Sequence, residues 1–183
     1  MGPPMNDMMR LVEPLIPALR RYARSLVGDR AAADDLLQDC LERAITRWHQ
    51  RRSDGDARTW LFTILHNLAI SRLRQLARRG RHVELDEADE SATARPPTQE
   101  DALRHRDVLR ALETLPEEQR SVLLLVSVED LSYAEAARVL DIPVGTVMSR
   151  LSRAREKLSR AMAPDAASPP ERSGRRPTLW RVK

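Results

Sequence analysis

The sequence predicts an all-α fold, with two small helical domains joined by a flexible acidic linker. Apolar residues recur at helical spacing through most of the chain, for example at Leu11, Leu15 and Leu19. Aromatic residues make up only 3% of the chain, whereas strands favour aromatic and β-branched side chains. The charge also changes sign sharply near residue 82, which indicates a boundary between domains.

That change in charge defines the predicted domain organisation. The stretch 72–82 contains five arginines and no acid, and residues 83–101 then contain seven acidic residues against Arg95 alone. An acidic stretch that also holds Pro96 and Pro97 is typical of a linker rather than a packed segment. The predicted segments are a first domain over 10–82, the linker over 83–101, a second domain over 102–162 and a disordered tail over 163–183.

Three helices account for the first domain, predicted over 11–28, 30–49 and 57–79. We expect Pro14 and Pro17 in the first turn of the first helix, where a missing N–H costs least. Gly28 should end that helix, and Asp29 should cap the next one. A polar loop over 50–58 precedes the third helix.

The second domain is also predicted to be helical. Its helices are expected over 99–114, from Pro116 through Val128, over 132–140 and over 143–162. Ser132 and Glu135 have the spacing of a capping box, with Ser132 as N-cap of the third of these helices. A tight turn over 141–145 separates it from the last helix.

Composition excludes several classes of site. Cys40 is the single cysteine, so a disulfide framework and a cysteine-rich zinc site are excluded, and its place on an apolar stripe predicts a buried, unreactive thiol. The histidines have no metal-binding spacing, and no P-loop or glycine-rich dinucleotide turn is present. No apolar run approaches the roughly 20 residues of a membrane span. We therefore expect a soluble, cytoplasmic protein that inserts into no membrane and carries no metal or cofactor.

Residues 132–162 have the pattern of a helix-turn-helix unit, in which a short helix and a turn precede a basic helix that enters the major groove of DNA. The candidate DNA-facing residues of the basic helix are Thr146, Met148, Ser149, Arg150, Ser152, Arg153 and Arg155. Arg153 is the best placed to read a base edge through two hydrogen bonds. The alternative is a helical hairpin with a solvated basic face.

The third helix shows a second polar face that core packing does not explain. Its outward residues include Thr63, Asn67, Ser71, Arg74 and Arg78. Neutral hydrogen-bonding groups can read base edges and arginines can hold phosphates, while the preceding loop could receive an unstacked base. Trp60 is in register with the apolar face, so we interpret it as a core anchor rather than a stacking platform.

The second helix carries an acidic motif, with Asp34, Asp35 and Asp39 within six residues. Aspartates at this spacing could hold Mg²⁺ for phosphoryl chemistry, which would indicate an enzyme. No second acidic motif faces this one, and two small helical domains offer no deep cavity. We therefore favour an exposed acidic face that is solvated or docks a protein partner.

Taken in order, these segments resemble a bacterial RNA polymerase sigma factor of the extracytoplasmic-function (ECF) type, within the sigma-70 family. The residues that carry the resemblance are 34–44, similar to region 2.2, 58–74, similar to regions 2.3 and 2.4, and 115–120 with 131–155, similar to region 4. The resemblance covers roughly residues 10–162.

The resemblance implies a non-enzymatic role in promoter-specific initiation of transcription, with an anti-sigma factor as the inhibitor. It implies that the second helix docks the β and β′ subunits of core RNA polymerase through Asp35, Gln38, Asp39, Glu42 and Arg43. The melted −10 strand of promoter DNA would be held by Arg58, Thr63, Asn67, Ser71, Arg74 and Arg78, and the −35 element by the face of the basic helix given above.

Two other classes of function remain open from the residues alone. A helix-turn-helix regulator that acts without polymerase explains 132–162 but leaves the polar face over 58–75 unexplained. A Mg²⁺-dependent enzyme would use the acidic motif, and it should show turnover in the absence of polymerase.

Overall fold

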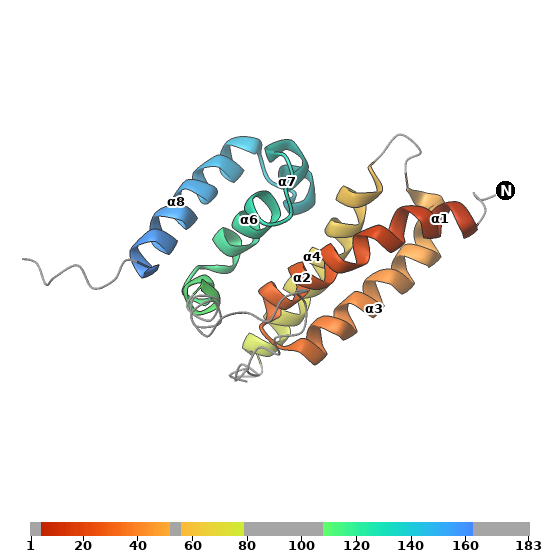
Figure 1. The fold of residues 1–183 in the computed structure, drawn as a ribbon, viewed down its shortest axis with the longest axis horizontal. Helices are drawn as coiled ribbons and strands as arrows, with labels where there is room; N and C mark the ends of the chain where they lie inside the picture. Colours follow the sequence, from red (N-terminus) through yellow and green to blue (C-terminus); the bar gives the residue numbers. More distant parts are fainter. Residues whose placement is uncertain (1–4, 52–55, 79–107, 163–183) are drawn as a thin grey trace, which may run out of the picture.

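A computed structural model describes residues 5–51, 56–78 and 108–162, and every regular element in these ranges is a helix. The helices form two groups that lie side by side (Figure 1). One group comes from the N-terminal half of the chain and the other from the C-terminal half, as the sequence predicts. None of the described helices is both long and apolar enough to cross a membrane.

The start of the first group differs from the prediction of one helix over 11–28. Helix α1 (Met5–Val12) is followed by a 3-10 turn, η1 (Glu13–Leu15), and then by α2 (Ile16–Val27). Pro14 lies in the turn and Pro17 in the first turn of α2. Proline has no N–H to donate, so two prolines this close interrupt the α-helical hydrogen bonds rather than merely opening one helix.

Helices α3 (Arg30–Arg47) and α4 (Ala57–Arg78) complete the first group, with a 3-10 turn, η2 (Trp48–Gln50), after α3. Gly28 ends α2 in the left-handed conformation, with φ of 76°, and its N–H donates to Arg24 O. The Asp29 carboxylate accepts from the Ala31 N–H over 2.9 Å, so the predicted cap is confirmed.

The second group contains α6 (Glu117–Ser127), α7 (Tyr133–Leu140) and α8 (Val144–Met162). Residues 108–113 are also helical, and the rest of the predicted helix over 99–107 lies outside the described residues. The capping box of Ser132 and Glu135 at the start of α7 is confirmed. Asp141 ends α7 with φ of 52°, a left-handed conformation that aspartate tolerates better than most residues.

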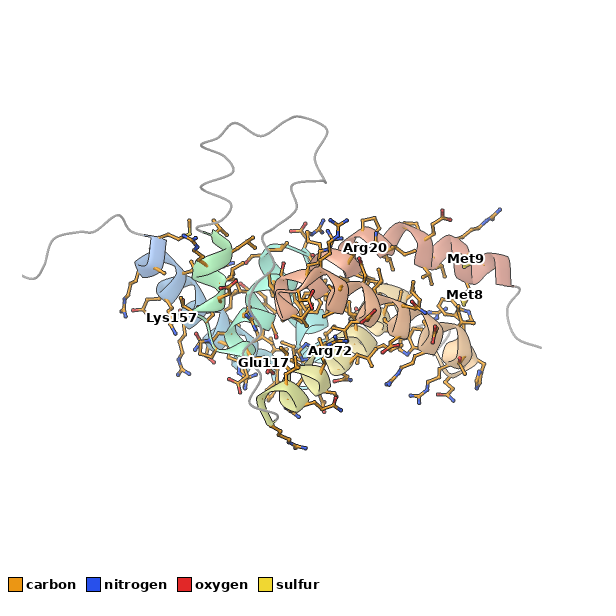
Figure 2. All side chains as sticks on the ribbon, turned by 90° about the horizontal axis from the view of Figure 1, so that it is seen from below. Met8, Met9, Arg20, Arg72, Glu117 and Lys157 are labelled. Atoms are coloured by element: carbon orange, nitrogen blue, oxygen red, sulfur yellow. The ribbon has the colours of Figure 1, made fainter. Side chains whose placement is uncertain are left out.

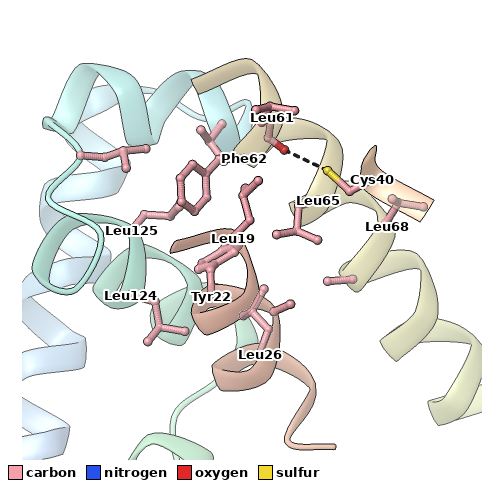
Figure 3. Packing of buried hydrophobic residues seen from close by; sticks show 14 of the residues in the cluster. Leu19, Tyr22, Leu26, Cys40, Leu61, Phe62, Leu65, Leu68, Leu124 and Leu125 are labelled. Carbon is pink, nitrogen blue, oxygen red and sulfur yellow. Dashed lines mark hydrogen bonds between the residues drawn. The ribbon is translucent and has the colours of Figure 1, made fainter. Parts of the chain in front are cut away.

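The two groups share one continuous apolar core. Tyr22 of α2 packs edge-to-face on Phe62 of α4, with ring centroids 5.4 Å apart. Leu125 of α6 lies beside this aromatic pair (Figure 3). The contact surface therefore consists of α2 and α4 on one side and of α6 and α7 on the other.

The predicted linker over 83–101 and the predicted tail over 163–183 lie outside the described residues, as do positions 52–55 of the polar loop.

Candidate nucleic-acid interface

Helix α8 has one buried side and one exposed side. Val147, Leu151 and Ala154 are buried against α6 and α7. The other side presents the predicted DNA-facing set: Met148, Ser149, Ser152, Arg153 and Arg155 are exposed, and Thr146 and Arg150 are half-buried. These residues thus lie on a single helix, with the capped helix α7 packed beside it.

Two basic side chains of α8 bond to their own domain. Arg155 donates to Ser127 Oγ over 3.4 Å, and Lys157, labelled in Figure 2, donates to Thr114 O over 2.6 Å. The first hydrogen bond joins α8 to the end of α6, and the second joins it to Thr114, which precedes α6. Arg153, in the middle of α8, is exposed.

Met148 is an unusual member of this exposed side, since 53% of its surface is open to solvent. Val144, in the first turn of α8, is exposed as well. Beside it lies a shallow depression lined by α7 and the turn before α8, including Ala134, Ala137, Arg138 and Ile142. The start of α8 therefore combines apolar surface with the polar residues of the predicted interface.

The predicted polar face of α4 is largely present. Asn67, Ser71, Arg74 and Arg78 are exposed, whereas Thr63 is half-buried. The Thr63 hydroxyl donates to Thr59 O and the Ser71 hydroxyl to Asn67 O, both over 2.8 Å. Each hydroxyl oxygen therefore keeps lone pairs that can accept a hydrogen bond from a base.

Arg58 does not lie with this set. Its guanidinium is 6.0 Å from the ring centre of Phe62, on the side of α4 that faces the second domain. It also donates a hydrogen bond to the backbone carbonyl of Glu129. The structure therefore separates Arg58 from the other predicted −10 residues.

Asp56 is a residue of this region to which the sequence analysis gave no role. Its carboxylate accepts from the Arg58 and Thr59 N–H groups and from the Thr59 hydroxyl, over 2.9 to 3.1 Å. Although burial opposes it, these hydrogen bonds hold the pKa of Asp56 below its usual value. Asp56 thus fixes the start of α4. An aspartate directly before Ala57, the first residue of the helix, is the sequence signal that could have identified this role.

Trp60 agrees with the prediction of a core anchor. It is half-buried and packs edge-to-face on Trp48, with ring centroids 5.7 Å apart. The guanidinium of Arg51 in turn lies 4.7 Å from the centre of the Trp48 ring.

The predicted polymerase-docking residues of α3 are all exposed: Asp35, Gln38, Asp39, Glu42 and Arg43. Within this set the Gln38 amide donates to Glu42 over 3.0 Å. The exposed Ile45 continues the same part of the helix and adds an apolar side chain to it.

Two aspartates of the acidic motif pair with arginines of neighbouring helices. Asp34 accepts from Arg20 of α2 over 3.0 Å, and Arg72 of α4 lies 3.7 Å from Asp35; Figure 2 labels both arginines. In the described ranges no three His, Cys, Asp or Glu side chains are grouped so that they could hold a metal ion. These aspartates thus join α3 to the helices on its two sides.

The sequence analysis missed a charged contact between the two domains. Glu129, in the turn between α6 and α7, is fully buried in its side chain and accepts two hydrogen bonds from Arg21 of α2. The two bonds measure 2.8 and 2.6 Å, and they raise the pKa of Arg21 above its usual value. The partners are 108 positions apart, so no local sequence pattern could indicate this pair.

Two protein-family models match separate parts of the chain. Residues 12–66 match the family described as the Sigma2 domain of PhyR, and residues 105–158 match the family described as Sigma-70, region 4.

One similar curated protein is the ECF RNA polymerase sigma factor EcfG of Rhodopseudomonas palustris. It is 37% identical over 168 residues, which cover 90% of each chain. The chain belongs to the ECF sigma factors. This sigma factor is accordingly a protein of transcription initiation, and its family acts by binding rather than by catalysis.

Two solved structures resemble this sigma factor closely. The sigma factor RpoE of Bartonella quintana, in complex with the anti-sigma factor NepR, has a TM-score of 0.75 and 31% identity, with 88% of this chain and 99% of that chain covered. CnrH, in complex with the cytosolic domain of CnrY, has a TM-score of 0.63 and 29% identity, with coverage of 84% and 85%.

Proposed function

We propose that this sigma factor docks on core RNA polymerase through the exposed face of α3, and that α4 and α8 hold the −10 and −35 elements of its promoters. The observation that carries the proposal is the two-sided character of α8. Its apolar side chains are buried, while Ser149, Ser152 and Arg153 face solvent beside a capped helix α7. This is the arrangement of a helix-turn-helix that enters a major groove.

The proposed roles are assigned to the domains with the boundaries that the sequence predicts. Residues 10–82 serve polymerase docking and the −10 element, and residues 102–162 serve the −35 element, with the connection over 83–101. Since both domains belong to one chain, binding of the first element raises the effective concentration of the second contact.

The proposed role of α4 is to hold the melted −10 strand. Asn67 and Ser71 offer hydrogen-bonding groups, and Arg74 and Arg78 offer charge for backbone phosphates. A base that leaves the stack costs a few kcal/mol, so capture by such a face stabilises spontaneous melting.

An anti-sigma factor is the proposed regulator. The solved structure of RpoE contains the anti-sigma factor NepR. In this chain the exposed Val144 and Met148 offer apolar surface for such a partner. Because it acts with polymerase, we place this sigma factor in the cytoplasm.

The first test is size-exclusion chromatography of the chain with purified bacterial core RNA polymerase, followed by run-off transcription from a promoter library. We expect co-elution and new, promoter-specific transcripts. A chain that stays free of core yet shifts duplex DNA by itself would support the stand-alone regulator instead. Mg²⁺-dependent turnover without polymerase would support the hypothesis that the chain is an enzyme.

A pair of variants tests the docking face. Asp39→Ala should weaken co-elution with core polymerase, because Asp39 is exposed on α3. Glu118→Ala, which removes an exposed acid of α6, is the matched control and should leave co-elution unchanged. Equal effects of both changes would point to general charge rather than to a docking face.

A further inference from the structure

Glu129 joins the two domains at a point where a carboxylate has no access to water. Its side chain is fully buried, and both of its oxygens accept from Arg21 of the other domain. A buried carboxylate is tolerated only where such charged hydrogen bonds satisfy it. The pair therefore holds the domains in one particular arrangement and resists their separation.

The turn that carries Glu129 is itself held firmly. The Glu129 N–H donates to Leu124 O, and the Leu131 N–H donates to Leu125 O, each over 2.9 Å. Asp130 between them has a left-handed backbone with φ of 50°. The second domain thus presents the carboxylate to the first domain at a fixed position.

Arg58 also contacts Glu129, since its guanidinium donates a hydrogen bond to the Glu129 backbone carbonyl. Arg21 and Arg58 come from α2 and α4, two neighbouring helices of the first domain, and both guanidinium groups converge on Glu129. Removal of Glu129 would leave two positive charges side by side on the first domain. Such a pair attracts an anion, and the guanidinium fork matches a phosphate as well as a carboxylate.

We propose that Glu129 is an internal competitor of promoter DNA: in the free chain it occupies Arg21 and Arg58, and when the domains separate these two arginines bind a backbone phosphate instead. The proposal deepens the function proposed above, and it rests on that function for the presence of DNA along α4. It adds Arg21 to the DNA-binding residues and gives Arg58 two alternative partners.

The closed arrangement also has an apolar component. Tyr22, Phe62 and Leu125 are buried in the shared core, so separation of the domains exposes apolar surface as well as the charged pair. The ion pair of Glu129 and the apolar contact thus both favour the closed arrangement of the domains. Loss of Glu129 shifts the population towards the open chain.

The first experiment measures the shape of the full free chain by small-angle X-ray scattering. Glu129→Gln keeps the size of the side chain and removes its charge, and we expect a larger radius of gyration. Glu118→Gln is the matched control, because it makes the same change of side chain at an exposed acid of α6. Circular dichroism of each variant checks that helix content is retained.

The second experiment titrates a short fluorescent DNA duplex of random sequence with the same free chains. The apparent Kd equals the intrinsic Kd divided by the open fraction, so Glu129→Gln should bind about three- to tenfold more tightly than wild type. Glu118→Gln should bind like wild type, apart from the small general effect of one lost acid. A Glu129→Gln chain with unchanged shape and unchanged Kd overturns the proposal.

The third experiment asks whether Arg21 takes a phosphate once the chain is open. Arg21→Ala in the Glu129→Gln chain should lower the slope of log K against log salt by about 1. Arg20→Ala in the same chain is the matched control, since Arg20 is the exposed neighbour that pairs with Asp34. An equal slope for the Arg21 variant and its parent rejects the phosphate site.

If Glu129→Gln loses helix content, Arg21→Gln tests the same contact from the first domain and leaves the turn of Glu129 unchanged. It should enlarge the free chain, and a compact Arg21→Gln chain overturns the proposal. All these measurements use the free chain, so they hold even if the wild-type chain fails to join polymerase. Failure to bind polymerase would reject the proposed function. The measurements on the free chain would still decide whether Glu129 competes with DNA.

Discussion

The Tyr22 hydroxyl and His66 Nδ1 lie 3.0 Å apart and form a hydrogen bond between α2 and α4. Burial, and to a lesser degree the charge of Arg74, lower the pKa of His66 to about 4. Burial also raises the pKa of Tyr22 far above its usual value. Both groups are therefore neutral near pH 7, and Nδ1 accepts a hydrogen bond from the Tyr22 hydroxyl when the ring carries its proton on Nε2.

Acid should destabilise the chain through His66. His66 takes up a proton near pH 6.5 in the unfolded chain but only near pH 4 in the folded chain. The contribution of His66 to the free energy of unfolding is therefore fully present above about pH 6.5, and it is lost as the pH falls towards 4. We expect a loss of about 2 kcal/mol in the free energy of unfolding between about pH 7.5 and pH 5. Urea denaturation at the two pH values measures it. His66→Gln should reduce this dependence, whereas His49→Gln, at an exposed position, should not.

The Cys40 thiol should be almost unreactive in the folded chain. It is buried, its S–H donates to Leu61 O over 3.6 Å, and burial raises its pKa to about 12 (Figure 3). The thiolate is the reactive form, so alkylation by iodoacetamide should be slower in native buffer than in guanidinium by a factor of about 100 or more. Mass spectrometry follows this reaction cleanly because the chain has one cysteine. Equal rates in both solvents would show that the site opens freely.

The capping box of α7 should contribute measurably to stability. The Ser132 hydroxyl accepts from the Glu135 N–H, while the Glu135 carboxylate accepts from the Ser132 N–H over 2.7 Å. Hydrogen bonds from Ser132 hold the pKa of Glu135 below its usual value. Ser132→Ala should therefore cost about 1 kcal/mol in the free energy of unfolding. Ser159→Ala, at an exposed position of α8, is the matched control and should change it by less than about 0.5 kcal/mol.

Arg153→Ala should weaken promoter binding at one position. Arg153 is exposed on α8 and can form two hydrogen bonds to a guanine, so its loss should cost about 1–3 kcal/mol and relax the choice of base there. Arg160→Ala is the control, since Arg160 pairs with Glu156 near the end of the helix. Binding titrations on single-base variants of a −35 element measure both. A uniform loss over all bases would assign Arg153 to a phosphate instead.

Local signals in the sequence predicted most helices and their ends. Gly28, Asp29 and Ser132 act as predicted because a left-handed turn or a side-chain cap depends on neighbouring residues alone. Pro17 lies in the first turn of its helix as predicted, whereas Pro14 lies in the 3-10 turn before it, so the prediction of one helix over 11–28 was wrong. The prolines separate α1 from α2, and α1 buries Met8 and Val12.

The contact between the domains could not be predicted from the sequence. Phe62 lies outside the apolar face that periodicity assigns to α4, and it is buried because α6 and α7 cover it. Arg58 belongs to a polar segment, and only the fold shows that it points towards Glu129. Helical periodicity identifies one apolar face of a helix, whereas a helix between two domains buries a second.

The shared core also limits how this sigma factor can exchange parts with its relatives. A chimera that joined its first domain to the second domain of another sigma factor would keep Phe62 and lose the matched Leu125 surface. Shape complementarity in a core is sensitive to single methylene groups, so such a chimera would pack its two halves poorly. The exposed side of α8, which we propose reads the −35 element, lies outside that core, so substitutions there need no matching change in the first domain.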